Sequence, residues 1–268
     1  MFINNTLFAA LALGSILFYI GYILSNSIKM SSVRLILTVL FLALALPGVS
    51  FILYYLHMIQ EPVWYVELRS ISNFEVLASL MGLFFGFAAF KKRRVFGFNL
   101  KLLNICLFVI CMGLIFIPFC KPVLLPLDKS KLNNRWIDGV CLQSVGSTCG
   151  PSSFATVFLY YGISRSEKEI SQGAYSCSSG TENWYLIRYA RKNGLKVECM
   201  YKDTLQEVPF PSIIGTRIGQ LGHFITVFGK ESGKYIIGDS LKGRLLLSQR
   251  EFDERYAFEG FVMHVTKP

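Results

Sequence analysis

The chain has 268 residues, enough for a membrane module and one compact domain. Hydrophobic residues make up 53% of it and charged residues only 16%, proportions unlike those of ordinary soluble proteins. The net charge of +10 is spread evenly, since residues 1–120 carry 8 Lys and Arg against 3 Asp and Glu, and residues 121–268 carry 19 against 14. Neither part has the dense basic stripe that follows phosphates, so we expect no nucleic-acid partner.

Four stretches of the first 120 residues lack Asp, Glu, Lys and Arg: 6–24, 35–59, 76–90 and 102–119. A bilayer core about 30 Å thick takes about 20 apolar helical residues, so the third stretch is short. All four are apolar around their whole circumference, unlike the amphipathic helices of globular cores. We therefore predict a transmembrane helical bundle of about four helices over residues 1–120, and a Pro- and Asn-containing linker over residues 121–137.

Basic residues in the loops predict the orientation of this module, because loops rich in Lys and Arg stay in the cytoplasm. The second loop contains only Arg69, beside Glu61 and Glu67, and also Trp64 and Tyr65 as expected interfacial aromatics. The first and third loops contain seven basic residues, which are Lys29, Arg34, Lys91, Lys92, Arg93, Arg94 and Lys101. We expect an integral protein of a bacterial inner membrane with an extracytoplasmic C-terminal domain; loss of the third span would make that domain cytoplasmic.

The segment QSVGSTCGPSSFATVFLYYG, residues 143–162, contains the candidate nucleophile. Apolar residues recur at helical spacing over residues 154–161, Pro151 suits a first helical turn, and Gly162 suits a C-terminal stop. This pattern predicts a helix that begins near Cys149. There the helix dipole and the free backbone N–H groups favour the nucleophilic thiolate.

Gln143 lies six residues before Cys149, across a loop of small residues. Its side-chain amide can turn back toward the same point. Together with the Cys149 backbone N–H, it would then form an oxyanion hole. A buried cysteine that merely packs is the alternative interpretation, and the Gln, Gly and Pro context argues against it.

A thiolate needs a base, and the chain has three histidines. His57 falls in the second apolar stretch, and His264 lies in an apolar C-terminal strand where a hydrogen-bonded structural role is expected. His223 begins the run HFITVFG, which suits a strand and precedes a turn around Glu231 and a second strand ending at Asp239. We therefore expect His223 to be the base.

The expected hairpin also supplies a partner for this histidine. If its turn centres on residue 231, Asp239 lies directly opposite His223 on the same face of the sheet. We therefore expect Asp239 to orient the imidazole and to complete a set of nucleophile, base and orienter.

These residues resemble family thirty-nine of the papain clan of cysteine peptidases, which removes double-glycine leaders from bacteriocin precursors. The resemblance covers residues 138–268 and rests on Gln143, Cys149-Gly150-Pro151-Ser152, His223-Phe224-Ile225 and Asp239, with further matches at Gly180-Thr181 and over residues 186–197. It implies a papain-like α+β domain with Cys149 as nucleophile, His223 as base, Asp239 as orienter and Gln143 in the oxyanion hole. Ser240 stands where the family often has a Pro after its Asp. Bacteriocin-processing members of the family usually precede an ATP-driven exporter, whereas this chain contains no nucleotide-binding motif.

The expected function is that of a membrane-anchored thiol peptidase that cleaves a peptide or protein near the bilayer through an acyl-thioester. Two alternatives remain open. The same thiolate would serve an acyltransferase acting on lipid or lipoprotein substrates, so membrane lipid is also an expected partner. A domain without turnover would instead be a peptide-binding module.

Neither a cofactor nor a metal is expected. Cys141, Cys177, Cys199 and His264 lack the paired short spacings that are typical of zinc sites. An oxidising compartment would permit a disulfide between two of these three cysteines.

Overall fold

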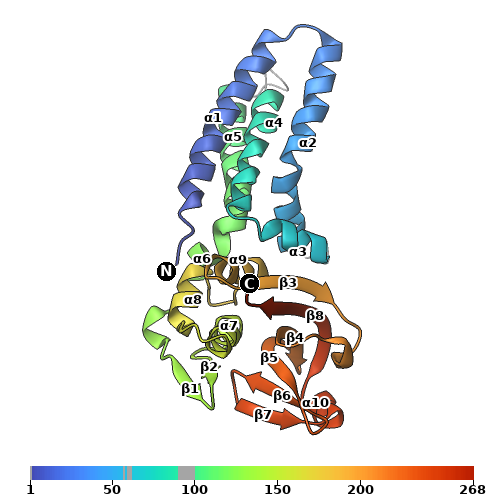
Figure 1. The fold of residues 1–268 in the computed structure, drawn as a ribbon. Helices are drawn as coiled ribbons and strands as arrows, with labels where there is room; N and C mark the ends of the chain where they lie inside the picture. Colours follow the sequence, from blue (N-terminus) through green and yellow to red (C-terminus); the bar gives the residue numbers. More distant parts are fainter. Residues whose placement is uncertain (1, 57, 59–61, 90–99) are drawn as a thin grey trace. The chain divides into compact units, whose positions relative to one another are not determined.

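The computed structural model describes residues 2–56, 58, 62–89 and 100–268. The chain divides into two compact units. A helical unit comprises residues 3–61 and 73–120, and an α+β unit comprises residues 1–2, 62–72 and 121–268 (Figure 1). His57, Glu61 and the expected basic cluster at residues 91–94 lie outside the described residues.

Apolar helices make up the first unit. They are α1 (Thr6–Ser27), α2 (Ser31–Tyr55), the 3-10 helix η1 (Phe74–Leu80), α4 (Met81–Ala88), α5 (Leu100–Phe116) and η2 (Ile117–Phe119). Among the described residues, three helical segments are long and apolar enough to cross a bilayer: Thr6–Ser27, Ser31–Tyr55 and Leu100–Leu124. The third predicted span, formed by η1 and α4, reaches the required length only together with α3 (Val63–Arg69), from which it is bent by 87°. The N-terminal part therefore has three to four apolar helices.

Glycines allow α1 and α4 to approach closely. A Cβ placed on Gly86 would lie 1.9 Å from the Phe18 carbonyl oxygen, and one on Gly82 would lie 2.3 Å from the Gly14 carbonyl oxygen. Gly82 and Gly86 form a G-x-x-x-G motif, the spacing that aligns two small residues on one face of a membrane helix. Backbone contact across such a face replaces the hydrophobic driving force that lipid does not provide.

Gly86→Val should therefore loosen the helical unit. The added side chain meets a helix backbone that cannot rotate away, and overpacking of this kind costs about 1–3 kcal/mol or more. Thermal unfolding of the full chain in detergent measures the loss. Gly113→Ala in α5 is the matched control, because a Cβ at Gly113 has no atom within 4 Å among the described residues. Equal melting temperatures for the two variants would contradict the close α1–α4 contact.

The α+β unit surrounds one main sheet with short helices. The helices from residue 120 onward are α6 (Cys120–Leu124), η3 (Lys129–Lys131), α7 (Cys149–Tyr160), α8 (Glu167–Gly173), α9 (Asn183–Lys192), η4 (Leu205–Glu207) and α10 (Gln249–Arg255). The strands are β1 (Arg135–Ile137), β2 (Val140–Leu142), β3 (Lys196–Tyr201), β4 (Ser212–Ile218), β5 (Leu221–Glu231), β6 (Lys234–Asp239), β7 (Gly243–Leu247) and β8 (Ala257–Thr266).

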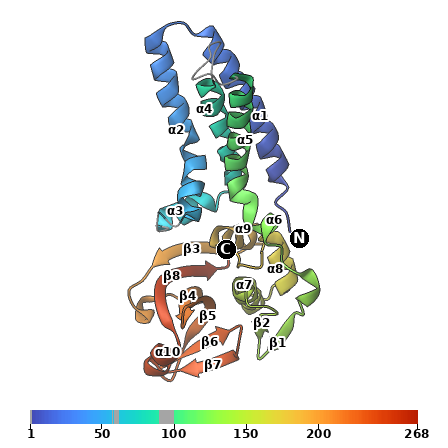
Figure 2. The same cartoon turned by 180° about the vertical axis from the view of Figure 1, so that it is seen from behind.

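All strand pairings in this unit are antiparallel. β1 and β2 form a separate hairpin, and the six-stranded sheet has the order β3-β8-β4-β5-β6-β7. Seen from either side, α7 lies next to the sheet and α10 lies at the β6–β7 end (Figures 1 and 2). The core includes Ile225, Val227 and Ile237 from the sheet and Phe252 from α10. The predicted α+β class of the C-terminal part is confirmed.

Helix α3 belongs to the α+β unit, although its sequence lies between the second and third apolar stretches. Glu67 accepts a hydrogen bond from the Cys199 backbone N–H at 3.1 Å and pairs with Arg191 at 2.6 Å. The Arg69 guanidinium is fully buried and lies 3.2 Å from the centre of the Trp184 ring. These contacts fasten α3 to α9 and β3. Of the two aromatics expected at a membrane interface, Tyr65 is buried in this unit and Trp64 is exposed.

Candidate active site

Cys149 is the first residue of α7, as the sequence predicts, and it is partly exposed. Helix α7 ends at Tyr160, followed by Gly162 with a φ of +74° that completes the predicted stop. Gly150 is required beside the cysteine, because a Cβ there would lie 2.7 Å from the Cδ1 atom of Leu186, which is itself fully buried. The sulfur therefore lies where the free backbone N–H groups of the first helical turn point.

Side-chain hydrogen bonds fix α7 against its neighbouring strands. Ser153 donates its hydroxyl to the Phe224 carbonyl at 3.1 Å, and Thr226 donates to the Ser153 carbonyl at 3.4 Å. On the opposite side, Thr156 accepts a bond from the Cys141 backbone N–H in β2 at 2.9 Å. Since Phe224 follows His223, the first two bonds also fix the distance between Cys149 and the histidine.

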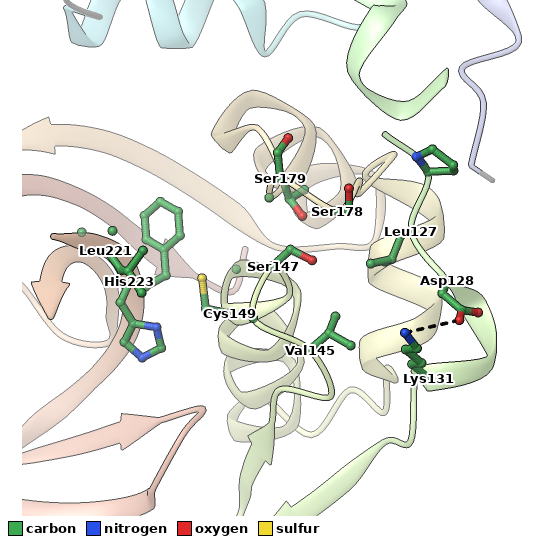
Figure 3. A pocket seen from close by; sticks show the side chains of 18 of the residues that line it. Leu127, Asp128, Lys131, Val145, Ser147, Cys149, Ser178, Ser179, Leu221 and His223 are labelled. Atoms are coloured by element: carbon green, nitrogen blue, oxygen red, sulfur yellow. Dashed lines mark ion pairs between the residues drawn. The ribbon is translucent and has the colours of Figure 1, made fainter. Parts of the chain in front are cut away.

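His223 and Asp239 form a buried hydrogen-bonded pair. The Nε2 atom of His223 lies 2.8 Å from Oδ1 of Asp239, and the two residues are only 7% and 1% exposed. Asp239 also accepts bonds from the Leu241 backbone N–H at 2.8 Å and from the Tyr256 hydroxyl at 2.7 Å. Because Nε2 is engaged by the carboxylate, Nδ1 is the ring nitrogen available to the Cys149 sulfur (Figure 3).

The strand register that brings this pair together differs from the prediction. The turn consists of Ser232 and Gly233, both with positive φ, and an irregularity in β5 between Val227 and Gly229 shifts the pairing once more. Thr226 is paired with Gly238, so Asp239 continues the ladder opposite Ile225, two residues beyond His223. The direct opposition expected from a turn at residue 231 is wrong. The two side chains still share a face and meet diagonally, within the reach of an imidazole.

This environment shifts the titration of both groups. Burial alone would lower the pKa of His223, but the hydrogen bonds with Asp239 and Cys149 and their charges raise it from an ordinary value of about 6.5 to about 9. Burial would raise the pKa of Asp239, but the bonds from His223, Leu241 and Tyr256 lower it. The histidine is therefore an imidazolium near neutral pH. Its contribution to folding stability is complete below pH 6.5 and is lost as the pH rises through about 9.

Gln143 directly follows β2, and its side chain is bonded to the turn after β6 and to the loop that leads to Cys149. Its Oε1 atom accepts a bond from the Ser240 hydroxyl at 2.7 Å, and its Nε2 atom donates to the Val145 carbonyl at 3.1 Å. The backbones are joined too, because the Gln143 N–H donates to the Ser240 carbonyl at 2.9 Å. A primary amide has two N–H donors, so the bond to Val145 uses one of them.

The loop between Gln143 and Cys149 has its own buried anchor. Glu167, fully buried at the start of α8, accepts bonds from the backbone N–H of Ser144 at 2.8 Å and from its hydroxyl. Ser144 in turn accepts a bond from the Asn133 backbone N–H at 2.8 Å. A buried carboxylate that holds the next residue restricts where Gln143 can point.

A pocket of about 760 Å³ opens beside Cys149 and His223, and Gln143 and Asp239 are not among the residues that line it. Cys149 and His223 lie at one side of it, the loop of Ser178 and Ser179 borders it, and Leu127, Asp128 and Lys131 line the side opposite His223 (Figure 3). The remaining lining is largely small, with Gly146, Gly150, Gly180, Gly215 and Gly222. The loop of Ser178 is tied to the preceding segment through its backbone N–H, which donates to the Leu125 carbonyl at 2.9 Å.

Other residues that the sequence singles out lie apart from this site. The Nδ1 atom of His264 lies 3.0 Å from the Pro211 carbonyl and 3.3 Å from the Ser212 hydroxyl, which agrees with the expected structural role. All seven cysteines are free, so the permitted disulfide does not form. Burial raises the pKa of the Cys141 thiol to about 12. No cluster of three or more His, Cys, Asp or Glu side chains suited to a metal occurs among the described residues.

Three features were missed from the sequence. Tyr256 and Glu167 gave no signal, because a lone Tyr in a helix-to-strand junction and a Glu after a helix cap are common on protein surfaces. The segment 126–131, expected to be a linker only, supplies a wall of the pocket. Its Pro126 makes a bridge with Cys177, a pairing between segments about 50 residues apart that no local pattern indicates.

Comparison with known proteins agrees with this geometry. Residues 139–268 match the model of the Peptidase C39 family. The C-terminal domain belongs to this family. The C39 domain is also similar to an uncharacterized protein of Methanothermobacter thermautotrophicus, with 26% identity over 129 residues that cover 48% of this chain and 89% of the relative. An uncharacterized protein of Methanothermobacter marburgensis is 27% identical over 125 residues, which cover 47% of this chain and 86% of the relative.

Solved structures similar to the C39 domain include two transporter-associated peptidases. One is the peptidase domain of Streptococcus ComA, a bifunctional ABC transporter, with 22% identity, a TM-score of 0.42 and coverage of 47% of this chain and 96% of that one. The other is a double-glycine-motif protease from an AMS/PCAT transporter, in complex with its leader peptide, with 22% identity, a TM-score of 0.43 and coverage of 52% and 94%. The family match at residues 139–268 confirms the family predicted from the sequence for the C-terminal part.

Asp239→Asn should lower the pKa of His223 from about 9. The substitution removes the charge of the Asp239 carboxylate, so that only Cys149 still opposes the effect of burial. Nuclear magnetic resonance titration of isotope-labelled histidine in the full chain follows the change. An unchanged His223 curve would show that Asp239 does not set this pKa.

Proposed function

We propose that this protein is a membrane-anchored cysteine peptidase that cleaves a peptide or protein substrate near the bilayer. One observation carries the proposal: the buried imidazole of His223 lies between the carboxylate of Asp239 and the thiol of Cys149 at the start of α7. A raised histidine pKa favours a thiolate–imidazolium pair, the reactive state of a cysteine nucleophile. Membership of the C39 family supports the same reaction class.

In the proposed mechanism, the Cys149 thiolate attacks the carbonyl carbon of the scissile peptide bond. The negative charge that develops on the oxygen is stabilised by the Cys149 backbone N–H and the Gln143 amide. The His223 imidazolium gives its proton to the leaving amine as the C–N bond breaks, which leaves an acyl-thioester on Cys149. Neutral His223 then takes a proton from water, whose oxygen attacks the thioester and releases the acid and the thiolate. Asp239 orients the imidazole and stabilises its positive charge throughout.

The proposed substrate is a peptide with small residues at the cleavage point, of the double-glycine type. Five glycines line the pocket together with larger residues such as Leu221 and Phe224, and Gly150 and Gly222 are the chain neighbours of Cys149 and His223. A peptide free to adopt extended backbone geometry between these walls can bring its carbonyl carbon close to Cys149. A lipoprotein is a second proposed substrate class, because the membrane anchor would hold the peptidase near lipid-attached proteins.

Cys149→Ala should abolish cleavage of a quenched fluorescent peptide with a central Gly-Gly, while the protein stays folded, because the change removes the nucleophile and little volume. Intact-protein mass spectrometry after rapid acid quench should show the acyl fragment on the parent enzyme and none on Cys149→Ala. Cys106→Ala, in the apolar helix α5, is the matched control and should retain cleavage. Cleavage by Cys149→Ala would refute the peptidase. An adduct on Cys149 from labelled phospholipid that transfers to an amine, without peptide cleavage, would favour the acyltransferase.

The location of α3 supports a four-span topology. Because α3 and residues 121–268 form one folded unit, both must lie on the same side of a bilayer. The chain between them includes the long apolar segment Leu100–Leu124, which crosses once. A return to the same side requires a second crossing, and the apolar segment that begins at Phe74 supplies it. The G-x-x-x-G face of α4 fits this role, since backbone-to-backbone packing of this kind suits a helix in lipid.

Orientation then follows from the loop charges. The side shared by α3 and the C39 domain is opposite to the side of Lys29 and Arg34, and basic loops remain cytoplasmic. The proposed location of the C39 domain is therefore extracytoplasmic, at a cytoplasmic membrane.

Cysteines introduced one at a time into a Cys149→Ala background test this topology with a membrane-impermeant maleimide on intact cells, and the background itself, which keeps six native cysteines, is the reference for labelling. Trp64→Cys in α3 and Leu246→Cys in β7, both at exposed positions, should be labelled. Met30→Cys between α1 and α2 should react only after permeabilisation. Labelling of only one of the first two would refute the even number of crossings. The reverse pattern, with Met30→Cys labelled and the other two protected, would place the C39 domain in the cytoplasm.

A further inference from the structure

The turn between β6 and β7 joins the two halves of the active site. It begins at Asp239, whose carbonyl accepts a bond from the Lys242 backbone N–H at 3.1 Å. Asp239 holds the imidazole, and the next residue, Ser240, is bonded twice to Gln143, through its hydroxyl at 2.7 Å and its carbonyl at 2.9 Å. Two adjacent residues thus contact both the proposed base and the proposed oxyanion donor.

The orientation of the Gln143 amide matters because only its nitrogen can stabilise an oxyanion. The Val145 carbonyl is an acceptor, so it selects the amide orientation in which Nε2 faces it. In this orientation Oε1 faces the β6–β7 turn, and the Ser240 hydroxyl donates a hydrogen bond to it. With one N–H given to Val145, the second N–H is the one available to a ligand.

Ser240 is buried, at 2% exposed, so water does not readily replace its hydroxyl. Without that hydroxyl, Oε1 of the partly buried Gln143 would lose its donor from the turn, and the amide would gain freedom to rotate.

We propose that Ser240 is a positioning residue that aims the Gln143 amide at the oxyanion formed on attack by Cys149. It does not touch the substrate and does not transfer a proton. Its hydroxyl acts through Gln143, so its effect should appear in the transition state and not in substrate binding. The inference rests on the proposed peptidase function and on the oxyanion role of Gln143.

Ser240→Ala should lower kcat about tenfold with KM unchanged, the loss expected for one buried hydrogen bond left half-made. Ser240→Thr keeps the hydroxyl and should restore most of the rate. Gln143→Ala should lower kcat by about a hundredfold or more, the usual cost of an oxyanion donor. The double variant should equal Gln143→Ala alone, since Ser240 then has nothing to aim. Ser212→Ala is the control, because it also removes a buried serine hydroxyl, one that donates to the Pro209 backbone carbonyl. It should leave kcat unchanged.

Steady-state cleavage of the Gly-Gly peptide by the full chain in detergent provides these values, and the pH profile provides a second readout. The alkaline limb of the pH profile of kcat should be the same in Ser240→Ala as in the parent. This result would show that the adjacent Asp239 still holds His223. The positioning role would be refuted if Ser240→Ala lowered kcat by the same factor in the parent and in Gln143→Ala. It would also be refuted if Gln143→Ala impaired kcat while Ser240→Ala left it unchanged. Activity in Cys149→Ala, or full activity in Gln143→Ala, would instead refute the proposed function on which the inference rests.

Discussion

The hydrogen bond between His223 and Asp239 is the interaction on which the rest of the C39 domain depends. Two ionisable side chains are withdrawn almost completely from water, and such burial is tolerated only where each polar atom is satisfied. Oδ1 of Asp239 is met by the imidazole and by the Leu241 backbone, and Oδ2 by Tyr256. The β6–β7 turn and the end of α10 are therefore structural requirements of the pair. Removing either would leave charge buried without a partner.

The same requirement links the pair to the opposite side of the pocket. The turn that satisfies Asp239 continues into Ser240, which reaches Gln143, and Gln143 precedes the loop that Glu167 anchors through Ser144. Helix α7, held between β2 and β5 by side-chain hydroxyls, delivers Cys149 to the middle of this arrangement. A change at Ser240 or Glu167 would therefore reach Gln143 or its neighbour Ser144 through a direct hydrogen bond.

Two segments that adjoin apolar helices in the chain belong to the C39 domain. Helix α3 comes from between two apolar segments, yet it packs on α9 and β3 with a buried arginine over a tryptophan. The segment 126–131, which leads out of the last apolar helix, lines the pocket. Segments that adjoin the apolar helices in the chain therefore also contribute to the core and to the pocket of the C39 domain.

Local chemistry was sufficient to predict much of this protein. Helix α7 and its nucleophile follow from apolar spacing, Pro151 and Gly162, and the apolar helices follow from composition, since both signals are contained within a few turns of one element. The partnership of His223 with Asp239 also followed, because a shift of the register by two residues keeps side chains on one face of a strand.

Only the tertiary structure decided which residues satisfy the buried groups. The actual register depends on a turn at Ser232 and an irregularity in β5, and neither has a reliable local signature. Tyr256, Glu167 and Ser240 meet their partners across separations of 17, 23 and 97 residues. Hydrogen bonds of that kind depend on how whole elements pack, so the sequence by itself determined the fold class and the candidate nucleophile, base and orienter, whereas the three-dimensional packing selected the residues that hold them.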